Sequence, residues 1–161
     1  MKPFTPCLWF DGQAEQAANF YTRIFPDGRI DSVDRSPGDV PGGEKGSVLT
    51  VNFTINGTQF VGLNGGPQYS FTEAISFMVH CEDQAEVDRY WDALTEGGGE
   101  PGPCGWLKDR FGVSWQVIPK QLFETIGGSD AAGAERAMQA MLKMQKLDVA
   151  ALEAAYAGTD S

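Results

Sequence analysis

One pattern of elements occurs twice along this chain, and it restricts the possible folds more than any other feature. In each half a strand-like segment precedes an amphipathic helix and then up to three further strand segments, and the second copy lies 69 residues after the first. The pattern is repeated although few residues are identical. A single βαβββ module would leave one sheet face exposed and bury little apolar surface. The repeat therefore predicts an α+β fold in which two modules join into a cup-shaped mixed sheet with the helices outside.

Residue spacing places the strands and helices of both modules. The first module, residues 4–65, is expected to contain strands at 4–10, 29–35, 47–55 and 58–64. The second, residues 74–118, is expected to contain strands at 74–81, 104–108 and 113–118. A helix follows the first strand of each module. The predicted buried face of the first helix carries Ala14, Ala17, Ala18, Tyr21, Ile24 and Phe25. The predicted buried face of the second helix carries Val87, Tyr90, Trp91 and Leu94. Asp83 is expected to cap the second helix, and Asn56-Gly57 predicts a tight hairpin turn.

The two modules are expected to form one domain over residues 1–120, followed by a helical tail over 121–161. Helical spacing extends from 129 to 158, and Asp148 is placed to cap the last helix. One stripe of the tail is formed by Ala134, Met138, Met141, Leu142 and Gln145. This stripe needs cover from the sheet or from a second subunit, and the sheet edges also need partners. Both features predict a homodimer.

Composition excludes several classes of function. The chain of 161 residues has a formal net charge of -10 and a pI near 4.4, so its surface repels nucleic acid and anionic lipid. No apolar run approaches the length of a membrane span. Three cysteines without a CxxC motif or a signal peptide predict reduced thiols in a cytoplasmic protein. The single histidine, His80, cannot build a histidine-rich metal site within one chain.

Four long segments resemble a known family. They read TPCLWFDGQAEQAANFY, LNGGP, AISFMVHCEDQAEVDRYW and CGWLKDRFGVSWQVIP. They are similar to the PhnB-like branch of the vicinal oxygen chelate superfamily, which also contains glyoxalase I, extradiol dioxygenases, and fosfomycin- and bleomycin-resistance proteins. This branch is often labelled demethylubiquinone methyltransferase. The resemblance extends into the tail segment AMLKMQKLDVAALEAAYAG, and it implies two βαβββ modules that form a cup, usually within a dimer.

The resemblance also implies where metal-dependent relatives hold their ion. Gln116 falls where such relatives place a glutamate ligand, and Thr5 and Ala74 fall near the histidine ligands of the two modules. The offset of 69 residues relates Thr5 to Ala74 independently. A neutral amide is a poor ligand for a divalent cation, and neither other residue replaces a histidine. We therefore expect a cup that binds no metal and no cofactor.

A metal-free cup that binds a small molecule is the first functional hypothesis. Its expected lining is Cys7, Trp9, Asn52, Asn64, Ser76, Trp106 and Gln116. Aromatic walls with a few amides suit a flat or partly apolar ligand, whose identity the sequence leaves open. Gln116 could orient that ligand or brace a neighbouring strand.

Two other hypotheses remain open at the level of the sequence. The protein could be an enzyme of unknown reaction, in which His80 or a cysteine is the only obvious group that titrates near neutrality. Cys104 is expected to be inert because no histidine is close to it in sequence. Alternatively, the cup could be empty and the protein could act in assembly through its tail. The methyltransferase label lacks support from the residues, because no strand is followed by a GxGxxG loop and a helix.

Overall fold

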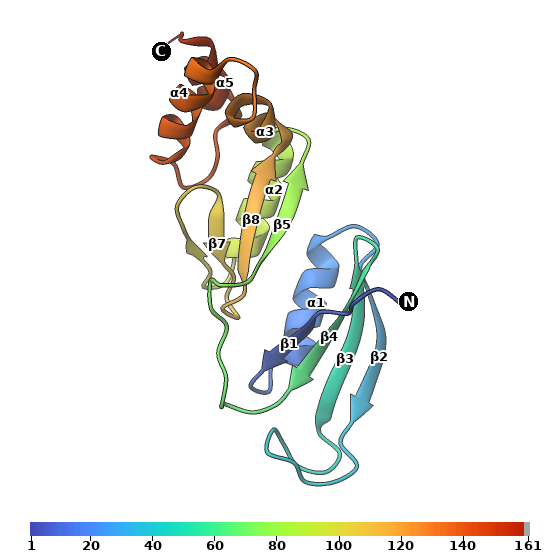
Figure 1. Ribbon diagram of the computed structural model, residues 1–161. Helices are drawn as coiled ribbons and strands as arrows, with labels where there is room; N and C mark the ends of the chain where they lie inside the picture. Colours follow the sequence, from blue (N-terminus) through green and yellow to red (C-terminus); the bar gives the residue numbers. More distant parts are fainter. Residues whose placement is uncertain (160–161) are drawn as a thin grey trace. The chain divides into compact units, whose positions relative to one another are not determined.

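The computed structural model of the protein describes residues 1–159, which divide into two compact units (Figure 1). The first unit is Met1–Phe71, and the second begins at Thr72 and includes the C-terminal helices. Each unit contains one four-stranded sheet of mixed direction and one helix that follows its first strand. The α+β class and the two repeated βαβββ modules are therefore confirmed.

The first unit is a sheet in the order β1-β4-β3-β2. Its elements are β1 (Cys7–Phe10), α1 (Ala14–Ile24), β2 (Arg29–Arg35), β3 (Val48–Ile55) and β4 (Thr58–Asn64). β1 pairs with β4 in parallel, and the other pairs are antiparallel. The first strand begins later than expected, because Phe4 is fully solvent-exposed rather than part of the sheet.

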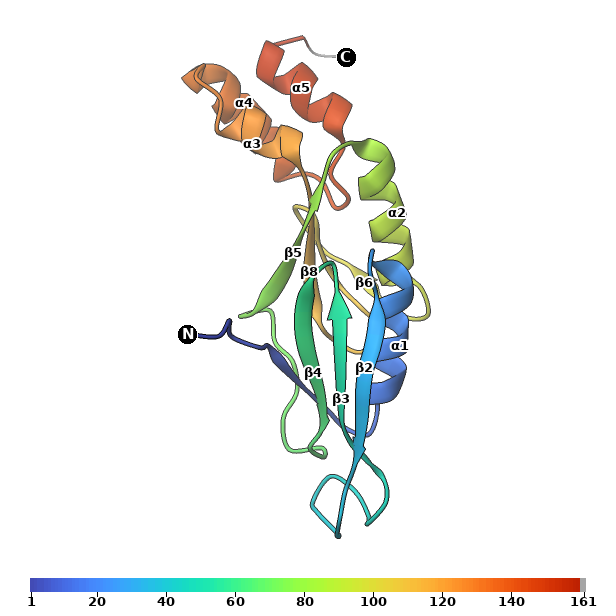
Figure 2. The same ribbon diagram turned by 90° about the vertical axis from the view of Figure 1, so that its right-hand side faces the viewer.

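Helix α1 covers one face of this sheet (Figure 2). The strand predicted at 47–55 is confirmed as β3, and its alternate residues Val51, Phe53 and Ile55 are buried on the helix side. Tyr21 of α1 stacks on Phe53 with ring centroids 6.1 Å apart. The hairpin at Asn56-Gly57 is also confirmed, with φ of 46° and 77° as a type I′ turn requires.

The second unit repeats the arrangement in the order β5-β8-β7-β6. Its sheet elements and helix are β5 (Ser76–Cys81), α2 (Gln84–Thr95), β6 (Glu100–Pro101), β7 (Trp106–Lys108) and β8 (Ser114–Pro119). The predicted cap of α2 is confirmed, since Asp83 Oδ1 accepts a hydrogen bond from the Glu86 amide at 2.9 Å. The predicted buried face of that helix is also buried in the structure. β6 was not predicted, because a two-residue strand containing proline gives no periodic signal.

The tail forms three helices, α3 (Lys120–Ile126), α4 (Ala131–Met141) and α5 (Val149–Ala157). α3 falls within the predicted helical tail, although the expected helical spacing begins only at residue 129. Asp148 caps α5 as expected, accepting from the Ala151 amide at 3.0 Å. An apolar cluster joins the end of β8 to the tail through Ile118, Leu122, Leu147 and Leu152. None of the helices over residues 1–159 is long and apolar enough to cross a membrane.

The apolar stripe predicted for the tail is covered only in part within the chain, where Met141 packs against the apolar cluster. Met138 and Leu142 are exposed, whereas the buried positions of α4 are Gly133 and Ala137. Gly133 lies against Tyr156 of α5: a β-carbon at Gly133 would lie 2.6 Å from the Tyr156 carbonyl oxygen. The close approach of α5 to α4 at this glycine, and not the size of the apolar side chains, therefore decides which face of α4 is buried.

Candidate functional site

Gln116 lies at the centre of the second sheet, on the face away from α2. Its register partners are Met78 on β5 and Trp106 on β7. Side chains alternate between faces along a strand, so the neighbouring row of Phe77, Trp115 and Leu107 points the other way, toward the helix. Trp115 and Leu107 are buried there, whereas Gln116 and Trp106 are only half-buried. The amide is thus in a strand that contributes to the core, but on the face opposite the one that α2 covers.

The structure brings three of the predicted site residues together on this face. Gln116 Nε2 donates a hydrogen bond to Ser76 Oγ at 2.9 Å, which joins β8 to β5. Trp106 lies directly across from Gln116 on β7. This contact braces two strands, and it also fixes the amide in one orientation beside an indole. Both roles considered for Gln116 are therefore compatible with its geometry.

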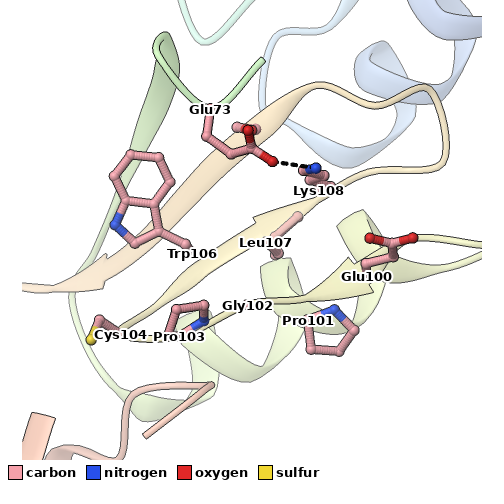
Figure 3. A pocket seen from close by; sticks show the side chains of 10 residues that line it. Glu73, Glu100, Pro101, Gly102, Pro103, Cys104, Trp106, Leu107 and Lys108 are labelled. Carbon is pink, nitrogen blue, oxygen red and sulfur yellow. Dashed lines mark ion pairs between the residues drawn. The ribbon is translucent and has the colours of Figure 1, made fainter. Parts of the chain in front are cut away.

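A hollow of about 460 Å³ lies at the β6–β7 side of the same sheet (Figure 3). Trp106 is the one predicted site residue among those that line it. The lining residues are Glu73, Glu100, Pro101, Gly102, Pro103, Cys104, Trp106, Leu107, Lys108 and Ser114. The sequence signal that could have indicated it is the run PGPCG before Trp106, since proline and glycine so close together shape a rigid, irregular wall.

The charges at this hollow are partly paired. Glu73 and Lys108 form an ion pair across it, drawn as a dashed line in Figure 3. The hydrogen bond from Lys108 lowers the pKa of Glu73, and the same bond raises the pKa of Lys108, so both groups are charged at neutral pH. Glu100 adds a further carboxylate to the lining. The lining therefore carries an excess of negative charge, and its lysine already has a carboxylate partner.

In the first unit, Cys7, Trp9 and Asn52 share the sheet face away from α1. Register pairs Cys7 with Val61 and Val61 with Asn52 across the sheet. Trp9 Nε1 donates to the Gly66 carbonyl oxygen at 2.9 Å, and its ring meets Tyr69 edge-on with centroids 4.9 Å apart.

The LNGGP segment forms the seat for Trp9. A β-carbon at Gly65 would lie 2.3 Å from the indole ring, so only glycine permits this contact. Gly66 has a φ of 103°, in the region that favours glycine, and its carbonyl oxygen receives the indole N–H. The two glycines thus position an aromatic side chain.

The two asparagines have different surroundings. Asn52 Nδ2 donates to Ser32 Oγ at 2.8 Å and to Asp34 Oδ2 at 3.1 Å, so it belongs to a polar network on the open face. Asn64 was expected to line the site together with Asn52. It lies on the opposite face of the sheet, because its register partner Phe10 is buried on the helix side.

The Asn64 amide is occupied by the backbone of its own unit. Its Oδ1 accepts from the Ala14 amide at 2.9 Å, and its Nδ2 donates to the Val48 carbonyl oxygen at 3.0 Å. Asn64 therefore satisfies the first amide of α1, whose cap residue Gln13 makes no side-chain capping bond. Asn64 therefore lies on the helix side of its sheet and does not belong to the open face.

The remaining titratable candidates differ in their exposure and in their distance from the hollow. His80 is exposed near the end of β5, and its ring centroid lies 6.3 Å from that of Phe123. Burial raises the pKa of the Cys81 thiol to about 12, and partial burial also raises the pKa of Cys7, although that residue remains exposed. Cys104 is half-buried and lines the hollow.

The residues around Gln116 do not fit a divalent metal. Its amide nitrogen is a donor to Ser76, and its register partners Met78 and Trp106 supply neither a carboxylate nor an imidazole. Ala74 has no donor atom in its side chain. Over residues 1–159, no three histidine, cysteine, aspartate or glutamate side chains are grouped so that they could hold a metal ion.

Comparison with known proteins agrees with this architecture. Residues 2–118 match the family model described as 3-demethylubiquinone-9 3-methyltransferase. A solved structure described as a putative 3-demethylubiquinone-9 3-methyltransferase, PhnB protein, from Bacillus cereus is 34% identical, with a TM-score of 0.64 over 73% of this chain and 99% of that one. No curated protein matches the chain.

More distant structures share the fold alone. A Pseudomonas aeruginosa protein is 21% identical with a TM-score of 0.61, over 74% of this chain and 98% of its own. The fosfomycin resistance protein FosX from Mesorhizobium loti is 15% identical with a TM-score of 0.50, over 72% of this chain and 89% of its own. The protein thus has the fold of the vicinal oxygen chelate superfamily, as the resemblance implied. Within that superfamily, the chain belongs to the PhnB-like family named for 3-demethylubiquinone-9 3-methyltransferase.

Proposed function

We propose that this protein binds a small organic molecule, without a metal ion, at the hollow and on the adjoining sheet face that carries Trp106 and Gln116. The observation that carries this proposal is the hollow itself, whose volume of about 460 Å³ is in the range typical of small-molecule sites. Trp106 contributes to its wall and also stands beside Gln116. An aromatic wall next to an oriented amide can hold a flat ligand and fix its direction.

The charge of the site favours neutral or cationic ligands over anions. Lys108 is paired with Glu73, so an anionic ligand would have to compete with that carboxylate. Glu100 and the net charge of -10 further disfavour anions. Two prolines and a tryptophan supply apolar contact area. The expected ligand therefore has a flat apolar body and a neutral or positively charged polar group.

The methyltransferase in the family description is not part of this proposal. A typical domain that binds S-adenosylmethionine has a doubly wound parallel sheet and a glycine-rich loop after its first strand. Here the two described sheets are separate, mixed and four-stranded. The segment between β1 and α1 is Asp11-Gly12-Gln13, which is not a glycine-rich loop of that kind. These observations support a binding protein over a methyltransferase.

A pair of aromatic dyes tests the proposal before the natural ligand is known. Thioflavin T is flat and cationic, whereas anilinonaphthalene sulfonate is flat and anionic. We expect thioflavin T to bind more tightly, and Trp106→Ala to weaken it by about tenfold through loss of aromatic contact. The matched control is Phe123→Ala, an exposed aromatic residue on α3 that does not line the hollow. Equal loss in both variants, or preference for the anion, would contradict the proposed site.

Gln116→Leu separates orientation of a ligand from bracing of the sheet. If Gln116 contacts the ligand, the variant weakens binding about fivefold, as expected for one polar contact of about 1 kcal/mol. If Gln116 only braces β5 through Ser76, the melting temperature falls while affinity is unchanged. A thermal-shift screen of metabolites and aromatic antibiotics would then identify natural ligands. A screen without hits, on a protein that also fails to bind the dyes, would leave a role in assembly as the better hypothesis.

The absence of a metal is tested separately. Protein dialysed against a chelator should contain far less than one divalent metal ion per chain by elemental analysis. Gln116→Glu should not create tight binding, because Ala74 and Thr5 still lack metal-binding side chains. About one ion per chain surviving dialysis would show that this part of the proposal is wrong.

A further inference from the structure

The wall of the hollow contains a turn whose backbone must be held in place. In residues 103–106, the Trp106 amide donates to the Pro103 carbonyl oxygen at 3.0 Å, and Cys104 and Gly105 have φ of 57° and 84°. Glycine adopts the left-handed region of backbone conformation without strain, whereas a residue with a side chain, such as Cys104, is strained there. Such a conformation persists where its surroundings fix it. The turn positions two lining residues, Cys104 and Trp106.

The turn is fixed by a distant part of the chain, the segment 144–149 of the tail, which we call the strap. The Cys104 amide donates to the Met144 carbonyl oxygen at 2.8 Å, and the Gly105 amide donates to that of Gln145 at 2.7 Å. The strap also packs against the turn, because a β-carbon at Gly105 would lie 3.0 Å from Leu147 Cδ1. Both amides at the centre of the turn therefore bond to the tail.

The strap is in turn fastened to α2. Gln84 Nε2 donates to the Leu147 carbonyl oxygen at 3.1 Å, and its Oε1 accepts from the Val149 amide at 2.7 Å. Lys146 forms an ion pair with Asp88 at 3.1 Å. The Leu147 side chain is fully buried in the apolar cluster at the base of the tail. One side of the strap thus meets the helix, and the other meets the turn.

We propose that the C-terminal tail is a positioning element of the binding site, which sets the place of Cys104 and Trp106 through the strap. Among the described residues, those that line the hollow all lie before the tail, so this action is indirect. The family model matches residues 2–118 only, so the strap lies outside the matched part of the chain. The shape and the ligand selectivity of the hollow can therefore differ from those of relatives that share the sheet. The effect on ligands rests on the proposed function, whereas the effect on the turn does not.

Amide hydrogen exchange measured by NMR on the full-length protein tests the effect on the turn. In the wild type, the amides of Cys104 and Gly105 should be protected although they lie outside the strands. Gln84→Ala removes the side chain that fastens the strap, and it should raise exchange at both amides by about tenfold. The matched control is Gln121→Ala, which removes a bond from α3 to the Glu82 carbonyl oxygen but does not touch the strap.

Three results overturn the inference. The first is an unprotected pair of amides in the wild type, a measurement that needs no variant. The second is unchanged exchange in Gln84→Ala while α5 exchanges faster, because the turn would then be independent of the tail. The third is equal acceleration in Gln84→Ala and the control. If Gln84→Ala also destabilises α2, Lys146→Ala is the milder variant, with about threefold faster exchange expected at the two turn amides.

Titration with thioflavin T then tests the consequence for binding. Gln84→Ala should weaken the dye by about fivefold although no residue of the hollow has changed, and the control should bind as the wild type does. Unchanged affinity with an opened turn would show that the tail does not set the site. If the wild type binds neither the dye nor any screened compound, the proposed function fails, and amide exchange alone still decides whether the tail holds the turn.

Discussion

Asp109 is the residue whose chemistry can be tested most sharply, because its carboxylate is buried and accepts several hydrogen bonds. Its Oδ1 accepts from the amides of Phe111 and Val113 at 2.8 and 3.0 Å, and its Oδ2 accepts from Trp115 Nε1 at 2.9 Å. Only 3% of the residue is exposed. The carboxylate therefore fixes the turn that precedes β8, and with it the strand that carries Gln116.

Asp109→Asn keeps the shape of the side chain but replaces one acceptor oxygen with a donor NH₂ group. If the oxygen stays with the two amides, the new NH₂ group faces the Trp115 N–H, and two donors meet. A hydrogen bond to a charged group is worth about 1.5–3 kcal/mol, and leaving a buried donor unsatisfied costs a similar amount. Allowing for partial relaxation, we expect the free energy of unfolding to fall by about 2–4 kcal/mol.

Urea unfolding followed by tryptophan fluorescence measures this change, and Asp83→Asn is the matched control. Asp83 makes one capping bond at an exposed helix start, where asparagine caps about as well as aspartate. The control should therefore stay within about 0.5 kcal/mol of the wild type. If Asp109→Asn were equally mild, the carboxylate would not be holding the turn, and the reasoning would be refuted.

Four further predictions concern other parts of the molecule. At pH 8, iodoacetamide should modify the exposed Cys7 well before Cys81, whose pKa is raised by burial from 9.0 to about 12; rapid labelling of Cys81 in folded protein would contradict that burial. Unfolded Cys81 ionises near pH 9, whereas the folded thiol keeps its proton up to about pH 12. The contribution of the protonated Cys81 thiol to stability is therefore complete below pH 9 and is lost as the pH rises toward about 12. Cys81→Ala lacks this thiol, so its free energy of unfolding in urea should decline less steeply at alkaline pH. Gly65→Ala should displace the Trp9 indole and lower stability by about 1–3 kcal/mol, whereas an unchanged melting curve would mean that Trp9 has room to move. Light scattering should give a homodimer, and a clean mass near 17.4 kDa at micromolar protein would argue against it.

Local signals were sufficient to predict most of the fold. The cap at Asp83, the hairpin at Asn56-Gly57 and the buried face of α2 depend on residues close together in sequence, and the structure confirms them. α3 follows a strand directly at Pro119, without a polar cap to mark its start. The buried face of α4 depends on Gly133, a residue that adds nothing to an apolar stripe. These two features are decided by packing between segments, which periodicity does not record.

The candidate site also contains features that local sequence signals predict and features that depend on packing between distant segments. Strand alternation places Trp106 and Gln116 on one face, and the register of β5, β7 and β8 confirms that they are neighbours. The same alternation should have placed Asn64 with Phe60 on the helix side, but the polarity of an asparagine favoured the open face. The run PGPCG could indicate an irregular wall, but the shape of the hollow could not be predicted, because it depends on the left-handed turn at Cys104 and on carbonyl groups far along the chain.

The parallel pairings have a consequence for the order of folding during synthesis. In each unit the first strand pairs with the last, β1 with β4 and β5 with β8, so neither sheet closes until its final strand has left the ribosome. The first unit can then close while the second is still being made. The second unit must wait longer, because the partners of Cys104 and Gly105 are encoded in the strap, well after β8. Nascent chains halted after β8 should therefore have a completed first unit and a second unit that is still open to proteases.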